Sequence, residues 1–204
     1  MATFMVQLSP PAQAALEYHR GKLADGQLWR VFTASLVHFG WLHWLTDAAT
    51  LAALSWIAAR RRRRVLGEVA LLAAAVGAAV HLLGGPVGSY RGLSGVNYGL
   101  LAALLVTMAR RAHGPASALG WGVLAVVIAK TAWELVVRAP LLPTALPHGV
   151  ALVAEAHAAG VVVGVLLALC RARSRPSPGP VGSDPTARPC CKTGRPIQSP
   201  PSWR

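Results

Sequence analysis

Two polar side chains in otherwise apolar stretches of the sequence could carry out chemistry together. Ser94 opens one stretch within Gly-Leu-Ser-Gly, and His157 lies in another within Glu-Ala-His-Ala-Ala-Gly. An ionisable side chain inside a membrane span indicates a functional site by default. A serine hydroxyl becomes a nucleophile when a base lies within hydrogen-bond reach, roughly 2.6–3.2 Å. We therefore predict that Ser94 is a nucleophile and His157 its base, working inside a bilayer.

Glycines follow both residues at a spacing that brings helices together. Gly95 and Gly99 come after the serine, and Gly160 and Gly164 come after the histidine. Small residues four positions apart let the backbones of two membrane helices approach closely. The sequence therefore predicts direct packing of these two helices, which would form a serine–histidine dyad without a third residue.

An acyl-transfer site also needs hydrogen-bond donors for the oxyanion. The backbone N–H of Ser94, at the start of a helix, and the side chain of His43 are the candidates. His43 and Asp47 are four positions apart and share a helix face. An ionised Asp47 would repel negative charge, so it helps either when burial keeps it protonated or by orienting His43. His38 is expected to be structural and to tie a loop to the end of the span.

Other polar residues in the apolar stretches are expected to stay outside the chemistry. Lys130 and Glu134 are four positions apart, which predicts an internal ion pair that lowers the cost of burying each charge. Glu155 lies two positions from His157 and so points to a different helix face. His81, near the end of a stretch, is expected to be solvated.

The elements that must position these residues are five apolar stretches in a chain of 204 residues that is 54% hydrophobic. The stretches lack the period-two alternation of a membrane β-barrel. A helix satisfies its own backbone hydrogen bonds in a bilayer. We therefore predict an all-α, polytopic membrane helix bundle. The predicted spans are 41–59, 65–83, 94–113, 117–137 and 150–170.

Arginine clusters indicate how this bundle is oriented. They follow the first, third and fifth spans, and positive charge favours the cytoplasmic side of a membrane. Ser94 then lies at the outer end of its span, and His157 about seven residues, or roughly 10 Å, into the last one. The active site is therefore expected to face the periplasm or the exterior, in a bacterial inner membrane.

The chain divides into three segments by composition. Residues 1–28 form a mixed N-terminal segment, and residues 29–170 form the membrane domain. Residues 171–204 are rich in Pro, Ser, Gly and Arg, which predicts a disordered, basic, cytoplasmic tail. The net charge of +13 falls in short runs rather than on one face, so we expect no nucleic-acid partner. The three cysteines lack metal-ligand spacing, and neither a metal nor another cofactor is expected.

Four motifs occur in chain order across residues 26–170. They are Trp29-Arg30, His38-x4-His43-x3-Asp47, Gly92-x-Ser94-Gly95 and His157-x2-Gly160-x3-Gly164. Together they resemble the motifs of the rhomboid family of intramembrane serine proteases. The resemblance implies that Tyr98 packs against the catalytic histidine. It also places Asp47 where the family has an Asn that helps to stabilise the oxyanion.

The resemblance implies six core spans, whereas five are clear here. The missing span would precede the Trp29-Arg30 pair, and the apolar residues 1–8 are expected to be its remnant in a truncated start. The short chain and the context Tyr90-Arg-Gly-Leu-Ser-Gly resemble the rhombosortase branch of the family. That branch implies cleavage of membrane-anchored proteins that carry Gly-Gly-containing C-terminal sorting tails.

The sequence is also compatible with two other functions. An inactive rhomboid-like protein would bind transmembrane segments without cutting them, and Asp47 and the short N-terminus keep this alternative in place. A small transporter or channel would have charged residues across both leaflets. The polar residues here gather in the outer half, which favours the protease.

Overall fold

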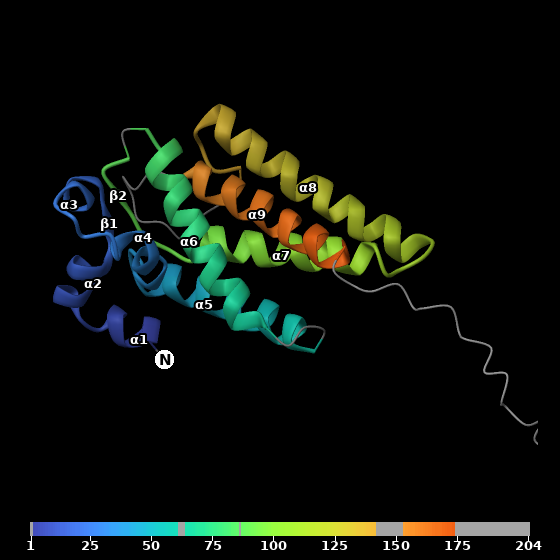
Figure 1. Ribbon diagram of the computed structural model, residues 1–204, viewed down its shortest axis with the longest axis horizontal. Coiled ribbons are helices and arrows are strands. Elements are labelled where there is room, and N and C mark those ends of the chain that lie inside the picture. The colour runs from blue at the N-terminus through green and yellow to red at the C-terminus, as the bar shows by residue number, and fades with distance from the viewer. Residues whose placement is uncertain (1, 61–63, 86, 142–152, 174–204) are drawn as a thin grey trace, which may run out of the picture. The chain divides into compact units, whose positions relative to one another are not determined.

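Long helices make up most of the structure, a computed structural model that describes residues 2–60, 64–85, 87–141 and 153–173. Figure 1 shows them lying side by side in one bundle. They are α5 (Trp41–Ala59), α6 (Val65–Leu83), α7 (Ser94–Ala109), α8 (Pro115–Val137) and α9 (Ala154–Arg173). The predicted all-α membrane bundle is confirmed.

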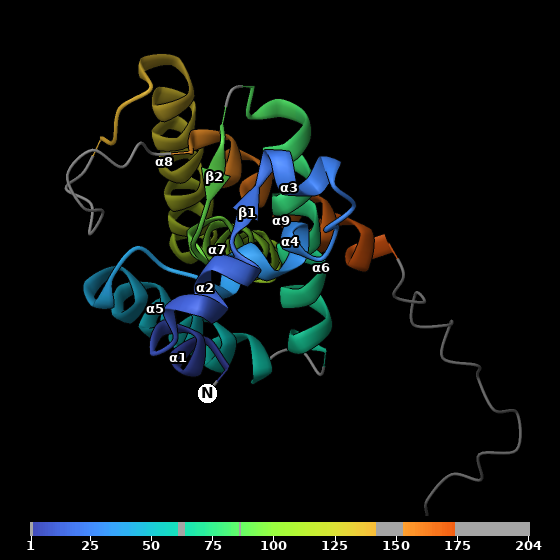
Figure 2. The same ribbon diagram turned by 90° about the vertical axis from the view of Figure 1, so that its left-hand side faces the viewer.

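Helix α7 forms the centre of the bundle. It packs against α5, α6, α8 and most extensively α9, and Figure 2 shows these helices around it. Most of its side chains are buried along its length, including Val96, Leu100 and Leu104. A helix that is apolar on every face is stable only in such a surrounded position. Ser94 is the first residue of this central helix.

Three of the described helices are long and apolar enough to cross a membrane. They are Val65–Leu83, Pro115–Val137 and Ala154–Arg171, and Ser94–Ala109 is a shorter apolar helix. Helix α5, at the first predicted span, is not among them and carries His43 and Asp47 among its buried residues. These lengths and compositions fit an integral membrane protein.

Two of the predicted span boundaries were wrong. Helix α7 ends at Ala109 instead of 113, because a turn begins there and leads to Gly114, whose φ is +58°, and Pro115. Proline disfavours helical backbone at the residue before it. Helix α9 begins at Ala154 instead of 150. His157 therefore lies in the first turn of its helix and not about 10 Å along it.

The N-terminal elements cover one end of the bundle, here called the site end, where α7 and α9 begin and α8 ends. These elements are α1 (Ala2–Gln7), α2 (Pro10–Leu16), α3 (Arg20–Ala24), α4 (Arg30–Thr33) and the 3₁₀ helix η1 (Ala34–Leu36). Strand β1 (Tyr18–His19) pairs antiparallel with β2 (Ser89–Tyr90), just before α7.

Buried polar contacts hold these short elements in place. Arg30 is 6% exposed and donates to the carbonyl oxygens of Ala14 and Glu17, each at 2.8 Å. His81 is partly exposed, and its Nδ1 also lies 3.1 Å from the Tyr18 hydroxyl. Since β1 pairs with β2, these contacts also fix the loop that leads into Ser94.

Candidate active site

Ser94 and His157 lie in direct contact at the site end. Ser94 is the first residue of α7, and its Oγ is 3.0 Å from Nε2 of His157 in the first turn of α9. The His157 side chain is buried. A hydroxyl and an imidazole at this distance are within reach for proton transfer.

Helices α7 and α9 touch through backbone atoms at the four glycines. A Cβ added at Gly160 would lie 1.9 Å from the Gly95 carbonyl oxygen, and one at Gly164 would lie 2.0 Å from the Gly99 oxygen. A Cβ at Gly95 would likewise lie 2.6 Å from the Ala156 oxygen. No side chain fits at these positions unless the helices move apart, so the glycines set the spacing between serine and histidine.

The loop before Ser94 is shaped by Gly92 and held from two sides. Gly92 has φ +122°, and a Cβ there would lie 3.1 Å from the His43 ring. Tyr90 donates its hydroxyl hydrogen to the Gly92 carbonyl oxygen at 3.1 Å. Burial, and then the nearby Asp47 charge, raise the pKa of the Tyr90 hydroxyl, so it stays protonated and remains a donor. The loop therefore enters α7 in one fixed direction.

Asp47 is the acceptor at the centre of a second buried cluster. Its Oδ2 accepts the Leu93 backbone N–H at 2.9 Å and lies 3.4 Å from Nε2 of both His38 and His43. Asn97 donates its side-chain amide to the Asp47 carbonyl oxygen at 3.1 Å. A carboxylate that accepts a backbone N–H is suited to orienting its neighbours and not to donating to an oxyanion. Asp47 thus ties α5 to the residue before the serine.

Glu134 reaches the other side of the histidine. Its Oε2 lies 3.0 Å from Nδ1 of His157, and its Oε1 lies 2.7 Å from Nζ of Lys130. Lys130 also donates to the Tyr98 hydroxyl, and the Tyr98 ring lies 4.5 Å from the His157 ring, centroid to centroid. The predicted ion pair between Lys130 and Glu134 is confirmed, and Glu134 makes in addition a contact with His157 that the sequence did not predict.

The sequence did not reveal the contact between Glu134 and His157, because the last span was predicted to begin four residues too early and so placed His157 too deep. In the structure Glu134 lies three residues before the end of α8, and His157 lies three residues after the start of α9. Each is therefore about 4.5 Å from the site end, because a helix rises 1.5 Å per residue. Asn97 was also missed, although it lies one turn after Ser94 on the same face. Glu155 faces away and pairs with Arg138.

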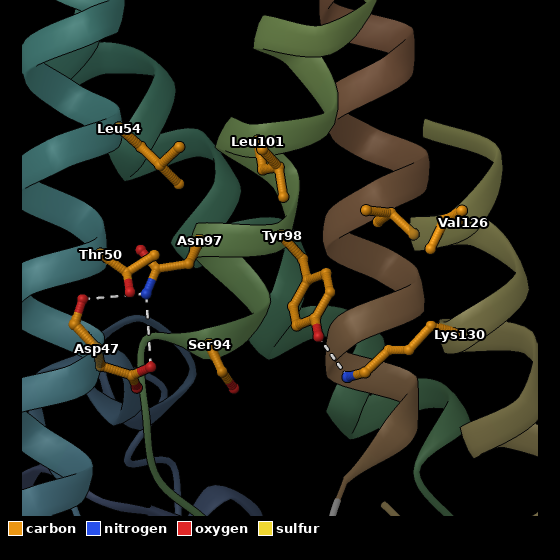
Figure 3. Close-up of a pocket in the computed structure, with 10 residues that line it drawn as sticks. Asp47, Thr50, Leu54, Ser94, Asn97, Tyr98, Leu101, Val126 and Lys130 are labelled. Carbon is orange, nitrogen blue, oxygen red and sulfur yellow. Dashed lines mark hydrogen bonds between the residues drawn. The ribbon is translucent and has the colours of Figure 1, made fainter. Parts of the chain in front are cut away.

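A cavity of about 400 Å³ opens beside Ser94 between α5, α7 and α8. Figure 3 shows Ser94 between Asp47 on one side and Tyr98 with Lys130 on the other. Its lining comprises Asp47, Thr50, Leu54, Ser94, Asn97, Tyr98, Leu101, Val126, Val127 and Lys130. The walls are apolar away from the site end and polar next to the serine. Such a space suits an apolar segment whose backbone meets polar groups at one end.

The comparisons with known proteins agree with this architecture. The family model for the rhomboid domain matches residues 25–174, which include the site. This chain belongs to the rhomboid family. Rhomboid proteins are in general serine proteases that act on membrane proteins within the bilayer, and this one is an integral membrane protein. A search of curated proteins found no match.

Proposed function

We propose that this rhomboid protein is an intramembrane serine endopeptidase, with Ser94 as nucleophile and His157 as base. The observation that carries the proposal is the 3.0 Å contact between Ser94 Oγ and His157 Nε2, at the start of two helices in backbone contact. A helix-packing serine needs no imidazole partner, and a structural histidine needs no hydroxyl beside a cavity. The pair and the cavity together favour catalysis over binding alone.

The reaction proceeds in two halves. Ser94 Oγ attacks the substrate carbonyl carbon while His157 Nε2 takes the hydroxyl proton, and the protonated imidazole then gives that proton to the leaving amine. Water next attacks the acyl-enzyme ester, with His157 again as base, and releases the carboxylic acid and the serine. The backbone N–H of Ser94 stabilises the oxyanion, because the first N–H groups of a helix have no partner within it. His43 accepts the Phe39 N–H at Nδ1 and faces Asp47 with Nε2, so it supports the loop at Gly92 and does not itself donate to the oxyanion.

The substrates are membrane-anchored proteins cut near the outer end of a transmembrane segment. The cavity between α5 and α8 takes the segment, which must unwind because a formed helix engages its own carbonyl groups. Gly-Gly sequences unwind at little steric cost, which favours substrates with C-terminal sorting tails of the rhombosortase type. The arginine clusters support a cytoplasmic tail and a site on the outer face of a bacterial inner membrane.

Replacing Ser94 tests this function. We expect Ser94→Ala to abolish cleavage of a transmembrane substrate in proteoliposomes, because alanine removes only the attacking oxygen. Ser89→Ala, at an exposed serine of β2, is the matched control and should cleave at the wild-type rate. Wild-type cleavage by Ser94→Ala would overturn the assignment. Substrate binding without any cleavage by the unaltered protein would instead support the inactive, segment-binding alternative.

A further inference from the structure

We propose that Glu134 is a positioning residue that extends the serine–histidine pair to a triad, and that Lys130 fixes which way Glu134 faces. The proposal rests on the function proposed above. It concerns one buried chain of contacts that runs from Lys130 through Glu134 and His157 to Ser94. The sequence motifs of the family do not include either of the α8 residues.

The two oxygens of Glu134 have separate partners, and this division fixes the histidine tautomer. Oε1 accepts from Lys130, so Oε2 is left to accept the Nδ1–H of His157. A neutral imidazole carries one N–H, so a proton on Nδ1 leaves the Nε2 lone pair facing the Ser94 hydroxyl. When His157 then takes the serine proton, the adjacent carboxylate stabilises the imidazolium.

A simple ion pair does not account for this geometry. Glu134 is 1% exposed and Lys130 14% by side chain, so the carboxylate is the more deeply buried partner. Its second oxygen meets a histidine of another helix, which an i,i+4 pair on one helix does not require. Burying a carboxylate is costly, and the lysine offsets that cost where Glu134 must meet His157.

Lys130 contacts both Glu134 and Tyr98, two of the residues that touch the His157 imidazole. It donates to the Tyr98 hydroxyl as well as to Glu134, and the Tyr98 ring packs against His157. Other charged and titratable groups near this end that the structure describes have partners elsewhere: Arg138 with Glu155, Asp47 with His38 and His43, Arg91 with Glu17, and Tyr18 with His81. Within the described residues, the carboxylate hydrogen-bonded to His157 is therefore that of Glu134.

Glu134→Gln tests the role with almost no change in shape. Lys130 will hold the amide oxygen, which turns the amide NH₂ toward His157 Nδ1 and places the imidazole proton on Nε2, facing Ser94. We expect kcat to fall by about a thousandfold per folded enzyme, with KM little changed, since a wrong tautomer removes the base and leaves substrate binding intact. Glu155→Gln, two residues from His157, is the matched control and should keep the wild-type kcat.

A double variant separates orientation from charge. In Lys130→Met with Glu134→Gln, no lysine holds the amide oxygen, so the amide can turn and accept from His157 Nδ1. We expect kcat to recover by about tenfold over Glu134→Gln yet to stay well below wild type, because a neutral amide stabilises the imidazolium poorly. The ¹⁵N chemical shifts of His157 should report the Nε2–H tautomer in the single variant and the Nδ1–H tautomer in the double variant.

The outcomes of these measurements separate the positioning role of Glu134 from the protease function itself. Should Glu134→Gln fold poorly, the double variant, which buries no unpaired charge, still decides the matter. A wild-type kcat in either variant, or an unchanged tautomer in Glu134→Gln, would show that Glu134 only neutralises Lys130. That result would leave Ser94 and His157 as a dyad. Cleavage by Ser94→Ala would instead overturn the protease itself.

Discussion

Two buried carboxylates reach the site from α5 and α8, the helices that flank α7 in Figure 3, and their partners differ. Asp47 accepts from the Leu93 backbone N–H and faces two histidines, and among the residues that the structure describes it forms no ion pair with a lysine or arginine. Glu134 faces one histidine and is paired with a lysine. A carboxylate bound to backbone fixes the position of a loop, whereas one bound to the base acts on proton transfer.

The two carboxylates hold different parts of the site. Asp47 holds the residue before Ser94, the proposed nucleophile. Glu134 contacts Nδ1 of His157, the proposed base, and in our proposal balances its charge. The two halves meet where the glycines of α7 contact those of α9, so moving these helices apart should disturb both halves at once.

Separating the two halves should cost more activity than neutralising Asp47 or removing the Tyr98 hydroxyl. In Gly160→Val, the new side chain meets the Gly95 carbonyl, where even a Cβ would lie at 1.9 Å, so α9 must move away from α7. A displacement of about 1 Å costs on the order of a hundredfold in rate. We expect at least that loss of kcat/KM in proteoliposomes. Gly122→Val is the control, because a Cβ at Gly122 meets nothing within 4 Å. Full activity of Gly160→Val would mean that the spacing of α7 and α9 does not control the pair.

How much of this arrangement the sequence predicts depends on whether a feature is local. The helical bundle follows from apolar stretches of about 20 residues, and Ser94 and His157 attract attention because polar groups are costly inside such stretches. The contact of Glu134 with His157 was not predicted, because Lys130, four positions earlier on the same helix, already offered Glu134 a local partner. Its contact with His157 depends on where α8 ends, where α9 begins and how both are rotated, which periodicity within one helix does not determine.

The role of Asp47 was also only partly predictable from the sequence. Its spacing from His43 predicts a shared helix face, and the two side chains do lie 3.4 Å apart. Its bond to the Leu93 N–H joins residues 46 positions apart in the chain. The sequence alone left two roles open for Asp47, donor or orienting acceptor, because only a folded loop shows which donors surround a carboxylate.

Neutralising Asp47 should cost less than neutralising Glu134. In Asp47→Asn the side-chain oxygen still accepts the Leu93 N–H, so the loop keeps its place while the charge near His38 and His43 is lost. We expect kcat to fall by about threefold to tenfold, the size of effect that a modest change in a neutral hydrogen bond produces. Asp47→Ala should cost more, because it leaves the buried Leu93 N–H without its partner. The rates are measured on the same transmembrane substrate as for Glu134→Gln. A loss in Asp47→Asn as large as in Glu134→Gln would contradict the division between the two carboxylates.

The Tyr98 hydroxyl should contribute least, because it acts on the base only through Lys130. Tyr98→Phe keeps the ring against His157 and removes the hydroxyl that Lys130 contacts. Lys130 still has Glu134, so the carboxylate stays oriented, and we expect kcat to fall by only about twofold to threefold, close to 0.5 kcal/mol of barrier. Tyr98→Leu removes the ring as well and should lose clearly more, because the imidazole is then free to rotate. Equal rates for the two variants would show that the ring does not position His157, and the base half of the site would then depend on Glu134 alone.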